Sequence, residues 1–279
     1  MSLLADPAPR RLAVLGSPIA HSKSPLLHAA AYRVLGLPWS YSAVEVIEGS
    51  LGAFLNTCGP EWLGFSLTMP LKREVLPMLR VRSDPVTAVA AANTLLLDGM
   101  RGFNTDVAGI VAAFRDHGVE SLHSVEILGG GATAAAALAA AARLGATHAT
   151  LRVRDPQRAA DALPIGATRG LEVSIRPLEE AARGSASAIV STLPAGAADG
   201  LRYDESVRRS AVLLDVAYDP WPSALAASWT DVGGVVVSGL EMLLHQAVGQ
   251  VRIFVTGHQR GALPREAEVV AAMRAAVGL

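Results

Sequence analysis

The chain of 279 residues contains a single cysteine, Cys58. One cysteine excludes an internal disulfide and a metal cage built from several thiolates. The longest apolar run, ATAAAALAAAA near residue 140, is mostly alanine and short for a bilayer span. The opening residues, MSLLADPAPRRLAV, lack the charged start, apolar core and cleavage site of a signal peptide. We therefore expect a cytoplasmic protein without a membrane segment or structural zinc.

An excess of charge of either sign is also missing. Lys+Arg number 24 and Asp+Glu number 25, which leaves a formal charge of -1. A chain of this balance has no bulk charge that would attract nucleic acid or an anionic membrane. We expect neither as a partner.

Lysine is almost absent from the basic residues, since Lys23 and Lys72 are the only lysines and 22 of the 24 are arginine. Proton transfer is one task that arginine does not take over, because a lysine pKa can be lowered by its surroundings whereas a guanidinium keeps its charge. The two lysines are therefore candidates for acid–base chemistry, and chance composition is the alternative. Lys23 lies in GSPIAHSKSPLLHAA and Lys72 in GFSLTMPLKREVL.

The order of apolar patterns predicts an α/β fold. Residues 11–16 and 39–46 are typical of strands on either side of an amphipathic helix that ends at Gly36, and a further strand leads to Pro70, which can open a helix. From residue 107 onward, helical patterns alternate with short apolar strands, as in a doubly wound parallel sheet of Rossmann type. We expect two domains, residues 1–104 with 239–279 and residues 105–238, the first built on a mixed sheet.

The segment AANTLLLDGMRGFNTD predicts a hairpin, because two strand-like arms flank a favoured two-residue Asp-Gly turn. If Leu97 pairs with Met100, Asn93 falls opposite Asn104. Asp106 would then project to the same side as Asn93. A longer loop would break this register.

A glycine-rich turn follows the apolar strand VEIL. Gly129, Gly131 and Ala134 match the pattern G-x-G-x-x-G/A at the start of an alanine-rich helix. Glycines there allow a tight turn and bring backbone N–H groups close to a pyrophosphate at the positive end of the helix. This context favours a dinucleotide site over a plain turn.

Lys72 and Asp106 each have an ordinary alternative. A lysine in the first turn of a helix is usually solvated, but the helix dipole makes a cation there slightly unfavourable, which favours a functional role. Asp106, in FNTDVAG, is typical of an N-cap or first-turn carboxylate. The seven histidines are scattered, and the sequence contains no Ser-His-Asp set or metal-binding motif. We expect no metal site.

Seven motifs occur in order along nearly the whole chain: GSPIAHSKSP, SLTMPLK, AANT, GFNTD, LGGGAT, DVAYDPWPSALAA and SGLEMLLHQA. Together they resemble shikimate dehydrogenase, the NADP-linked oxidoreductase family of the shikimate pathway, which leads to chorismate and the aromatic amino acids. The resemblance implies a substrate domain, an NADP-binding domain and interconversion of 3-dehydroshikimate and shikimate. It implies a small-molecule partner and a monomer or a homodimer.

The resemblance also implies roles for individual residues. Lys72 and Asp106 would form the catalytic pair, and both would contact the substrate. Lys23 would be a bystander between the two serines that hold the substrate carboxylate. The other substrate-binding residues implied are Ser22, Ser24, Thr68, Asn93, Tyr218 and Gln246. The cofactor-binding residues implied are Gly129, Gly130, Gly131, Ala132, Thr133, Arg154, Arg158, Gly239 and Met242.

The arginines after the glycine turn bear on the choice of cofactor. Period-two alternation puts Arg152 and Arg154 on the same face, so the pattern leaves open which one faces the nucleotide. The resemblance favours Arg154, with Arg158 as its partner on the 2′-phosphate of NADP. In the alternative, Asp155 turns inward and admits NAD.

The chain departs from the family at a few places. Ser66-Leu67-Thr68 stands where Asn-Val-Thr is usual, and Ala132 stands where glycine is common. VSTLPAG replaces a stretch that contains Asn-Ala-Thr, and LRVRD lacks the asparagine usual before the cofactor-reading arginine. These changes bear more on the cofactor than on the substrate.

Two other functions stay open from the residues. One is a quinate/shikimate dehydrogenase that uses NAD, which the sequence separates poorly from the first reading. The other is a non-catalytic ligand sensor on the same fold. The presence of both Lys72 and Asp106 argues against a sensor, because a sensor has no need of a proton-transfer pair.

Overall fold

The computed structural model describes residues 8–159, 162–180 and 186–279, and the side chain of Arg158 is also outside the description. The chain divides into two compact units. The first comprises Met1–Thr105 and Leu243–Leu279, and the second comprises Asp106–Met242. The expected boundaries lay near Asn104 and Gly239, and the second division falls instead a few residues into a helix that begins at Gly239.

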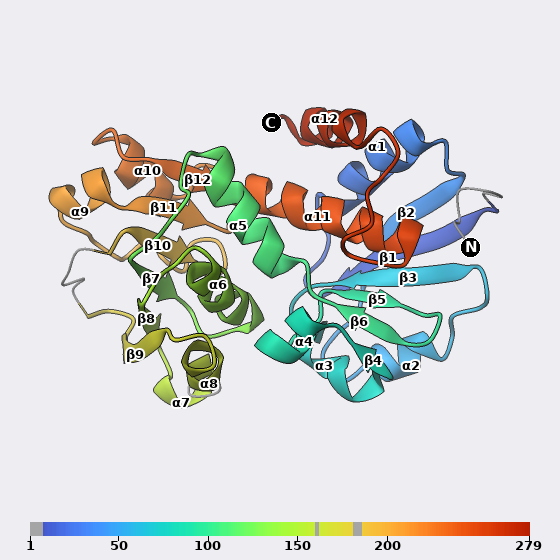
Figure 1. The fold of residues 1–279 in the computed structure, drawn as a ribbon, viewed down its shortest axis with the longest axis horizontal. Helices are drawn as coiled ribbons and strands as arrows, with labels where there is room; N and C mark the ends of the chain where they lie inside the picture. Colours follow the sequence, from blue (N-terminus) through green and yellow to red (C-terminus); the bar gives the residue numbers. More distant parts are fainter. Residues whose placement is uncertain (1–7, 160–161, 181–185) are drawn as a thin grey trace. The chain divides into compact units, whose positions relative to one another are not determined.

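The first unit is built on a mixed sheet with the strand order β2-β1-β3-β5-β6-β4 (Figure 1). Its strands are β1 (Arg10–Gly16), β2 (Trp39–Glu45), β3 (Trp62–Leu67), β4 (Val81–Arg82), β5 (Thr94–Leu96) and β6 (Arg101–Phe103). β1 runs parallel to β2 and β3, whereas β5 is antiparallel to both β3 and β6. The mixed sheet predicted for this part of the chain is confirmed.

Alternation along the strands divides the apolar residues of the first unit between two clusters. On β1, Leu12 belongs to one cluster, and Ala13 and Leu15 belong to the other. The first cluster includes residues of α1 (Ser24–Leu35), α11 (Gly239–Thr256) and α12 (Glu266–Val277). The second includes residues of α2 (Leu51–Leu55), α3 (Leu71–Glu74) and α4 (Asp84–Val89), and a short 3-10 helix, η1 (Leu76–Met78), follows α3.

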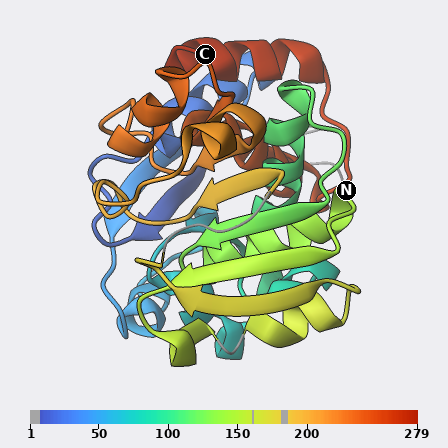
Figure 2. The same cartoon turned by 90° about the vertical axis from the view of Figure 1, so that its left-hand side faces the viewer.

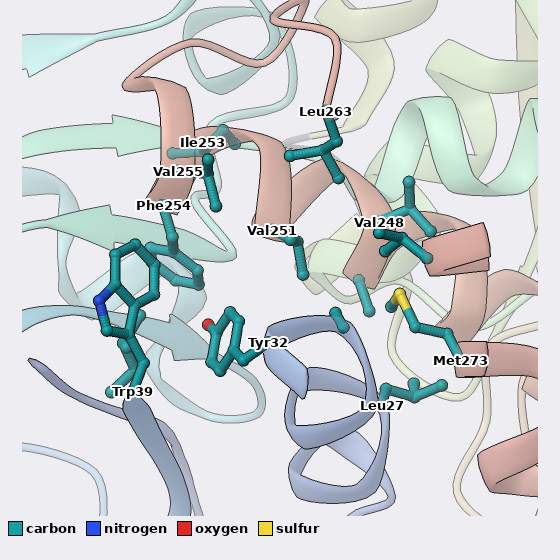
Figure 3. Packing of buried hydrophobic residues seen from close by; sticks show 14 of the residues in the cluster. Leu27, Tyr32, Trp39, Val248, Val251, Ile253, Phe254, Val255, Leu263 and Met273 are labelled. Atoms are coloured by element: carbon teal, nitrogen blue, oxygen red, sulfur yellow. The ribbon is translucent and has the colours of Figure 1, made fainter. Parts of the chain in front are cut away.

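Figure 3 shows the first cluster from close by. Tyr32 of α1 lies among Trp39 and side chains of α11, and Met273 of α12 lies beside Leu27. Gly36 ends α1 in the left-handed conformation, with φ of 67°, as the sequence predicts for a glycine cap. This packing fixes α11 over the sheet face that carries Leu12.

The hairpin has the register that the sequence predicts. Thr94 pairs with Phe103 and Leu96 pairs with Arg101 across β5 and β6. The amide of Met100 donates to the carbonyl of Leu97 at 3.0 Å, which closes the Asp-Gly turn. The extension of strand alternation to Asp106 is wrong, because β6 ends at Phe103 and Asp106 begins a helix.

The second unit is built on a parallel sheet with the order β12-β11-β10-β7-β8-β9, and Figure 2 shows these strands side by side. Its strands are β7 (Ser124–Leu128), β8 (His148–Val153), β9 (Glu172–Pro177), β10 (Ala188–Ser191), β11 (Val212–Asp215) and β12 (Val236–Ser238). The doubly wound parallel sheet is confirmed. The strand order reverses between β7 and β10, which is where such sheets bind ligands at the carboxyl ends of their strands.

Helix α5 (Asp106–Asp116) precedes β7. Five helices connect the strands of this sheet in the described residues: α6 (Ala132–Arg143), α7 (Pro156–Ala159), α8 (Leu163–Ala167), α9 (Glu205–Ser210) and α10 (Ala224–Thr230). α6 is buried from Ala134 to Ala141 and packs on β7, α5 and α8. Alanine is suited to a helix enclosed in this way, because it lets neighbouring backbones approach and loses no side-chain entropy. Within the described residues, no helix has the length and apolar character that a membrane crossing needs.

Candidate active site

Two backbone segments of the first unit meet where β1 and β3 end. The amide of Ser17 donates to the carbonyl of Met69 at 3.0 Å, and the amide of Thr68 donates to the carbonyl of Leu15 at 2.9 Å. Gly16 permits this contact, because a Cβ atom there would lie 2.3 Å from Cγ2 of Thr68. The loops that carry the predicted serines and Thr68 are thus joined at one edge of the sheet.

The two serines lie at the N-terminus of α1. The Oγ of Ser22 accepts a hydrogen bond of 3.3 Å from the amide of Ser24, which is the first residue of the helix. Ser22 is half-buried and Ser24 is buried. Lys23 is half-buried between them, and its carbonyl accepts from the amides of Leu26 and Leu27. Two hydroxyls at the positive end of a helix suit an anion such as a carboxylate.

His28 lies one turn further along α1, behind the serines. Its Nδ1 is 2.9 Å from the carbonyl oxygen of Ser24, and its ring stacks on Tyr41 with centroids 3.9 Å apart. A carbonyl can only accept, so Nδ1 carries the proton. Burial lowers the pKa of His28 to about 4, and the ring is therefore neutral near pH 7. His28 supports the serine loop as a neutral donor.

Lys72 is half-buried in the first turn of α3, where the sequence predicts a helix after Pro70. Its backbone is fixed from several sides. Leu71 before it is fully buried, and its own carbonyl accepts from the amide of Ala92 at 2.8 Å. The carboxylate of Glu74 accepts from the amides of Gly49 and Leu51, which ties α3 to α2. α3 is therefore held beside the segment that carries Asn93.

Asn93 makes a dense set of hydrogen bonds. Its Oδ1 accepts from the amide of Thr105 and from the hydroxyl of Thr94, both at 2.9 Å. Its Nδ2 donates to Oγ1 of Thr105 at 2.8 Å and to Oε1 of Gln246 at 3.3 Å. The amide of Thr105 can only donate, so the orientation of the Asn93 side chain is fixed. Asn93 and Gln246, both predicted to bind substrate, are in direct contact.

Asn104 has a supporting role in the same hairpin. Its Nδ2 donates to the carbonyl of Ala91 at 2.9 Å, and its own carbonyl accepts from the side chain of Gln259. The residue is buried. These bonds hold the segment that leads from β6 to Thr105.

Asp106 is the first residue of α5 and of the second unit, and it is 2% exposed. The sequence alone favours a first-turn carboxylate here, and the helix does begin at this residue. A buried carboxylate at this place keeps its interactions within the protein, which suits a group that orients a partner.

The glycine turn has the geometry expected of a nucleotide site. Gly129 follows β7 with φ of 113°, and a Cβ atom there would lie 2.5 Å from Oγ1 of Thr192. Gly131 directly precedes α6 and has open space where a Cβ would stand. The backbone at the N-terminus of α6 is therefore open to a pyrophosphate. Gly130, Ala132 and Thr133 complete the turn and are half-buried.

The two arginines of LRVRD have different environments. Arg152 is buried, and its Nη1 donates to Oε1 of Glu126 at 2.9 Å and to the hydroxyl of Tyr203. Arg154 follows the last residue of β8 and is exposed. Of the two arginines, Arg154 is therefore the accessible one. Arg158 lies in α7, and its side chain is outside the described residues.

Tyr218 lies in a loop fixed to the end of β11. Oδ2 of Asp215 accepts from the hydroxyl of Ser223 at 2.6 Å, and Oδ1 accepts from the amide of Ala217 at 3.2 Å. Asp215 is buried, and this desolvation raises its pKa above the ordinary value. Tyr218 is half-buried within the segment that Asp215 anchors.

Gly239 and Met242 lie at the beginning of α11. A Cβ atom at Gly239 would lie 2.3 Å from the carbonyl oxygen of Val216, so only glycine fits so close to this backbone. Met242 is 7% exposed. Both residues belong to the second unit, with the glycine turn and Arg154.

Sequence reasoning missed three residues whose side chains bond to Asn93. Thr94 and Thr105 bond its side chain, and Gln250 donates from Nε2 to its carbonyl at 3.0 Å. Gln250 lies four residues after Gln246 in a helix, which puts both on one face. That spacing is the signal from which Gln250 could have been found.

Comparison with known proteins assigns the family. The model for the shikimate dehydrogenase substrate binding domain matches residues 14–95. The chain is 32% identical to the shikimate dehydrogenase (NADP(+)) of Methanothermobacter thermautotrophicus, over 86% of this chain and 89% of that relative. It is 29% identical to a pentafunctional AROM polypeptide of Schizosaccharomyces japonicus over 91% of this chain, which spans 18% of that polypeptide.

Solved structures extend the likeness to the fold. The shikimate dehydrogenase of Mycobacterium tuberculosis matches with a TM-score of 0.83 and 39% identity, over 96% of this chain and 100% of that one. The shikimate 5-dehydrogenase of Thermus thermophilus in complex with NADP(H) and shikimate matches with a TM-score of 0.78 and 31% identity, over 96% and 99%. Because these likenesses cover nearly the whole chain, and because the family model covers the segments that carry Ser22, Lys72 and Asn93, this chain belongs to the shikimate dehydrogenase family.

Proposed function

We propose that this protein is an NADP-dependent shikimate dehydrogenase that interconverts 3-dehydroshikimate and shikimate, with Lys72 and Asp106 as its acid–base pair. The observation that carries the proposal is the meeting of the serine loop, the Thr68 loop and the Asn93 hairpin at one edge of the first sheet. These segments lie almost entirely in the part that the substrate-binding family model matches. The named relatives, including one solved with NADP(H) and shikimate, support the same activity.

In the reductive direction, NADPH held in the second unit would supply a hydride to the ring ketone. The ketone oxygen then gains negative charge, and the ammonium of Lys72 donates a proton to that oxygen to give the hydroxyl of shikimate. In the oxidative direction, neutral Lys72 accepts the same hydroxyl proton. The carboxylate of Asp106 orients the amine and accepts a hydrogen bond from a ring hydroxyl. The bonds made by Ala92 and Glu74 fix the backbone of α3, which carries Lys72. A lysine held in this way suits the role.

The substrate carboxylate is assigned to Ser22 and Ser24. Its charge does not change during the reaction, so neutral hydroxyls can hold it and fix the ring without a buried cation. The N-terminus of α1 adds a favourable field for an anion. Thr68, Asn93, Tyr218 and Gln246 are assigned to the rest of the substrate site.

NADP is assigned to the second unit. The open backbone at Gly131 and the N-terminus of α6 fit a pyrophosphate, with Gly129, Gly130, Ala132 and Thr133 in the turn. Exposed Arg154, with Arg158, is assigned to the 2′-phosphate. Gly239 and Met242 complete the residues assigned to the cofactor. The two units would accordingly act as a substrate domain and a cofactor domain.

The setting proposed for the enzyme follows from its composition. With a formal charge of -1, the chain would act without nucleic acid or membrane partners. We assign it to the cytoplasm, as a monomer or a homodimer. Sedimentation of the purified chain at several concentrations distinguishes the two assemblies.

The test is an assay of initial rates with shikimate or quinate, each with NADP or NAD, followed by nicotinamide absorbance. We expect the highest kcat/KM for shikimate with NADP. Preference for quinate with NAD would favour the sister activity on this fold. Binding of shikimate without turnover of either acid would favour a ligand sensor.

A further inference from the structure

We infer that Gln250 of α11 is a positioning residue for the proposed reaction. It holds the backbone at Asn93 through a chain of hydrogen bonds that begins at half-buried Tyr41 and passes through buried Ser66. The inference rests on the proposed function and adds to it a residue, Gln250, that lies outside the family motifs quoted above.

The chain of hydrogen bonds has one direction. The hydroxyl of Tyr41 donates to Oγ of Ser66 at 2.6 Å, and Ser66 donates to Oε1 of Gln250 at 2.9 Å. Nε2 of Gln250 then donates to the carbonyl oxygen of Asn93 at 3.0 Å. A carbonyl can only accept, so the amide of Gln250 has one possible orientation. Its oxygen must face Ser66, and Tyr41 must be the donor at the outer end.

Each member is placed by its element. On β3, Phe65 and Leu67 belong to the cluster on one face of the sheet, so Ser66 points to the other face, toward α11. A hydroxyl both donates and accepts, so serine can link two partners at this position. Ser66 stands where the family usually has asparagine. In this chain Tyr41 supplies a donor to the serine and Gln250 an acceptor.

Burial makes the chain of bonds stiff. Ser66 is 3% exposed, and Asn93 and Gln250 are each 1% exposed. A buried polar group that loses its partner is costly, because water does not replace the lost bond. Fully bonded networks in such surroundings keep one arrangement. The Asn93 carbonyl also accepts from the amide of Leu67 at 2.8 Å, so it is fixed from both the sheet and the helix.

Movement of Asn93 would displace two parts of the proposed site. Its side chain accepts from Thr94 and Thr105 and donates to Thr105 and Gln246. Thr105 directly precedes Asp106 in the chain, and Gln246 is assigned to the substrate. Gln250 therefore acts on the reaction through Asn93, without contact to the substrate itself.

The series of hydrogen bonds also connects to the serine loop at its Tyr41 end. The ring of Tyr41 stacks on His28, and Nδ1 of His28 bonds the carbonyl of Ser24. The same buried set of side chains thus supports both the serines assigned to the carboxylate and the Asn93 hairpin. Loss of Gln250 removes the link nearest to Asn93, whereas loss of the Tyr41 hydroxyl removes the most distant one.

The test compares Gln250→Met, Ser66→Ala and Tyr41→Phe with Ile253→Ala. Methionine keeps the length of glutamine without its hydrogen bonds. Ile253 is fully buried in the same helix and has no polar group, so its variant reports destabilisation alone. KM and kcat are measured for 3-dehydroshikimate and for NADPH, together with the unfolding temperature and shikimate binding by calorimetry.

We expect Gln250→Met to lose about tenfold or more in kcat/KM for 3-dehydroshikimate, with a raised KM for this substrate and an unchanged KM for NADPH. Ser66→Ala should lose less, and Tyr41→Phe least. The double variant Ser66→Ala/Gln250→Met should lose no more than Gln250→Met, because both act through one chain of bonds. Ile253→Ala, which lowers only the folded fraction, should leave both KM values unchanged.

Two outcomes contradict the inference in different ways. If the wild type reduces 3-dehydroshikimate and Gln250→Met has the kcat and KM of Ile253→Ala at equal folded fraction, Gln250 is only structural and the proposed function stands. If the wild type neither binds shikimate nor reduces 3-dehydroshikimate, the proposed function and this inference both fail.

Discussion

Arg152 and Glu126 form a buried ion pair, with Nη1 2.9 Å from Oε1, between the neighbouring strands β8 and β7. The guanidinium of Arg152 also donates to Tyr203 and to the carbonyls of Leu178 and Glu180. Arg152 is 3% exposed and is bonded within the protein. Exposed Arg154, which lies beyond the end of the strand, is therefore the arginine that we propose for the 2′-phosphate.

Replacement of Arg154 and Arg158 by alanine should therefore raise KM for NADP at least tenfold. Loss of the two arginines removes charge-assisted hydrogen bonds to the 2′-phosphate, a group that NAD lacks. Activity with NAD should stay almost unchanged, and steady-state kinetics with both cofactors provide the check. Equal losses with NADP and NAD would show that the arginines do not read the phosphate.

Glu126→Gln should lower the free energy of unfolding by about 3–5 kcal/mol, because it leaves a buried guanidinium without its counter-charge. The exposed pair Arg209–Glu205 is the matched control. Glu205→Gln should cost at most about 0.5 kcal/mol, as is usual for exposed pairs one helical turn apart. Chemical denaturation measures both variants. Similar costs for the two would contradict the structural role given to Arg152.

The elements that the sequence predicted well are those with strong local rules. The Asp-Gly turn set the pairing of Leu97 with Met100, and Gly36 ended α1 where a left-handed residue was expected. The glycine turn after β7 was visible because it combines a strand, spaced glycines and a helix. Local chemistry was sufficient in each case.

Elements without an apolar pattern were missed. β9 is an edge strand whose residues are mostly exposed, and β4 is only two residues long. Alternation could not separate Arg152 from Arg154, because both fall on one face and only the end of β8 at Val153 distinguishes them. The partners of Asn93 come from positions 105, 246 and 250, and no local rule connects such distant residues.

The stability of the protein should fall as the pH drops from 6.5 to 4 because of His28. In the unfolded chain this histidine takes up a proton near pH 6.5, whereas burial lowers its folded pKa to about 4. The folded state binds fewer protons in that range, so acid favours unfolding, by on the order of 3 kcal/mol in total. His28→Phe keeps a ring on Tyr41 and removes the titration.

Denaturation of wild type and His28→Phe at several pH values tests this prediction. The wild type should lose stability relative to the variant as the pH falls below 6.5. Parallel curves for the two proteins would mean that His28 is protonated in the folded state or is not buried. His148→Gln, at an exposed histidine, should follow the wild type.

The serine loop should govern substrate affinity. Ser22→Ala with Ser24→Ala should raise KM for shikimate about tenfold or more, because the carboxylate loses both hydroxyls. Any loss in kcat would come from misorientation of the ring. Lys23→Arg, between the two serines, is the control and should be nearly silent in initial-rate kinetics. Damage from Lys23→Arg equal to that from Lys72→Arg would mean that the catalytic lysine had been wrongly chosen.

The central claim is that Lys72 moves the proton during hydride transfer, and kcat of Lys72→Ala tests it most directly. A positioned acid–base group contributes about 10²–10⁴ to the rate. The account predicts a fall in kcat of that order for reduction of 3-dehydroshikimate, with a much smaller change in the dissociation constant of shikimate and a folded protein by circular dichroism. A Lys72→Ala enzyme with near-normal kcat would contradict it.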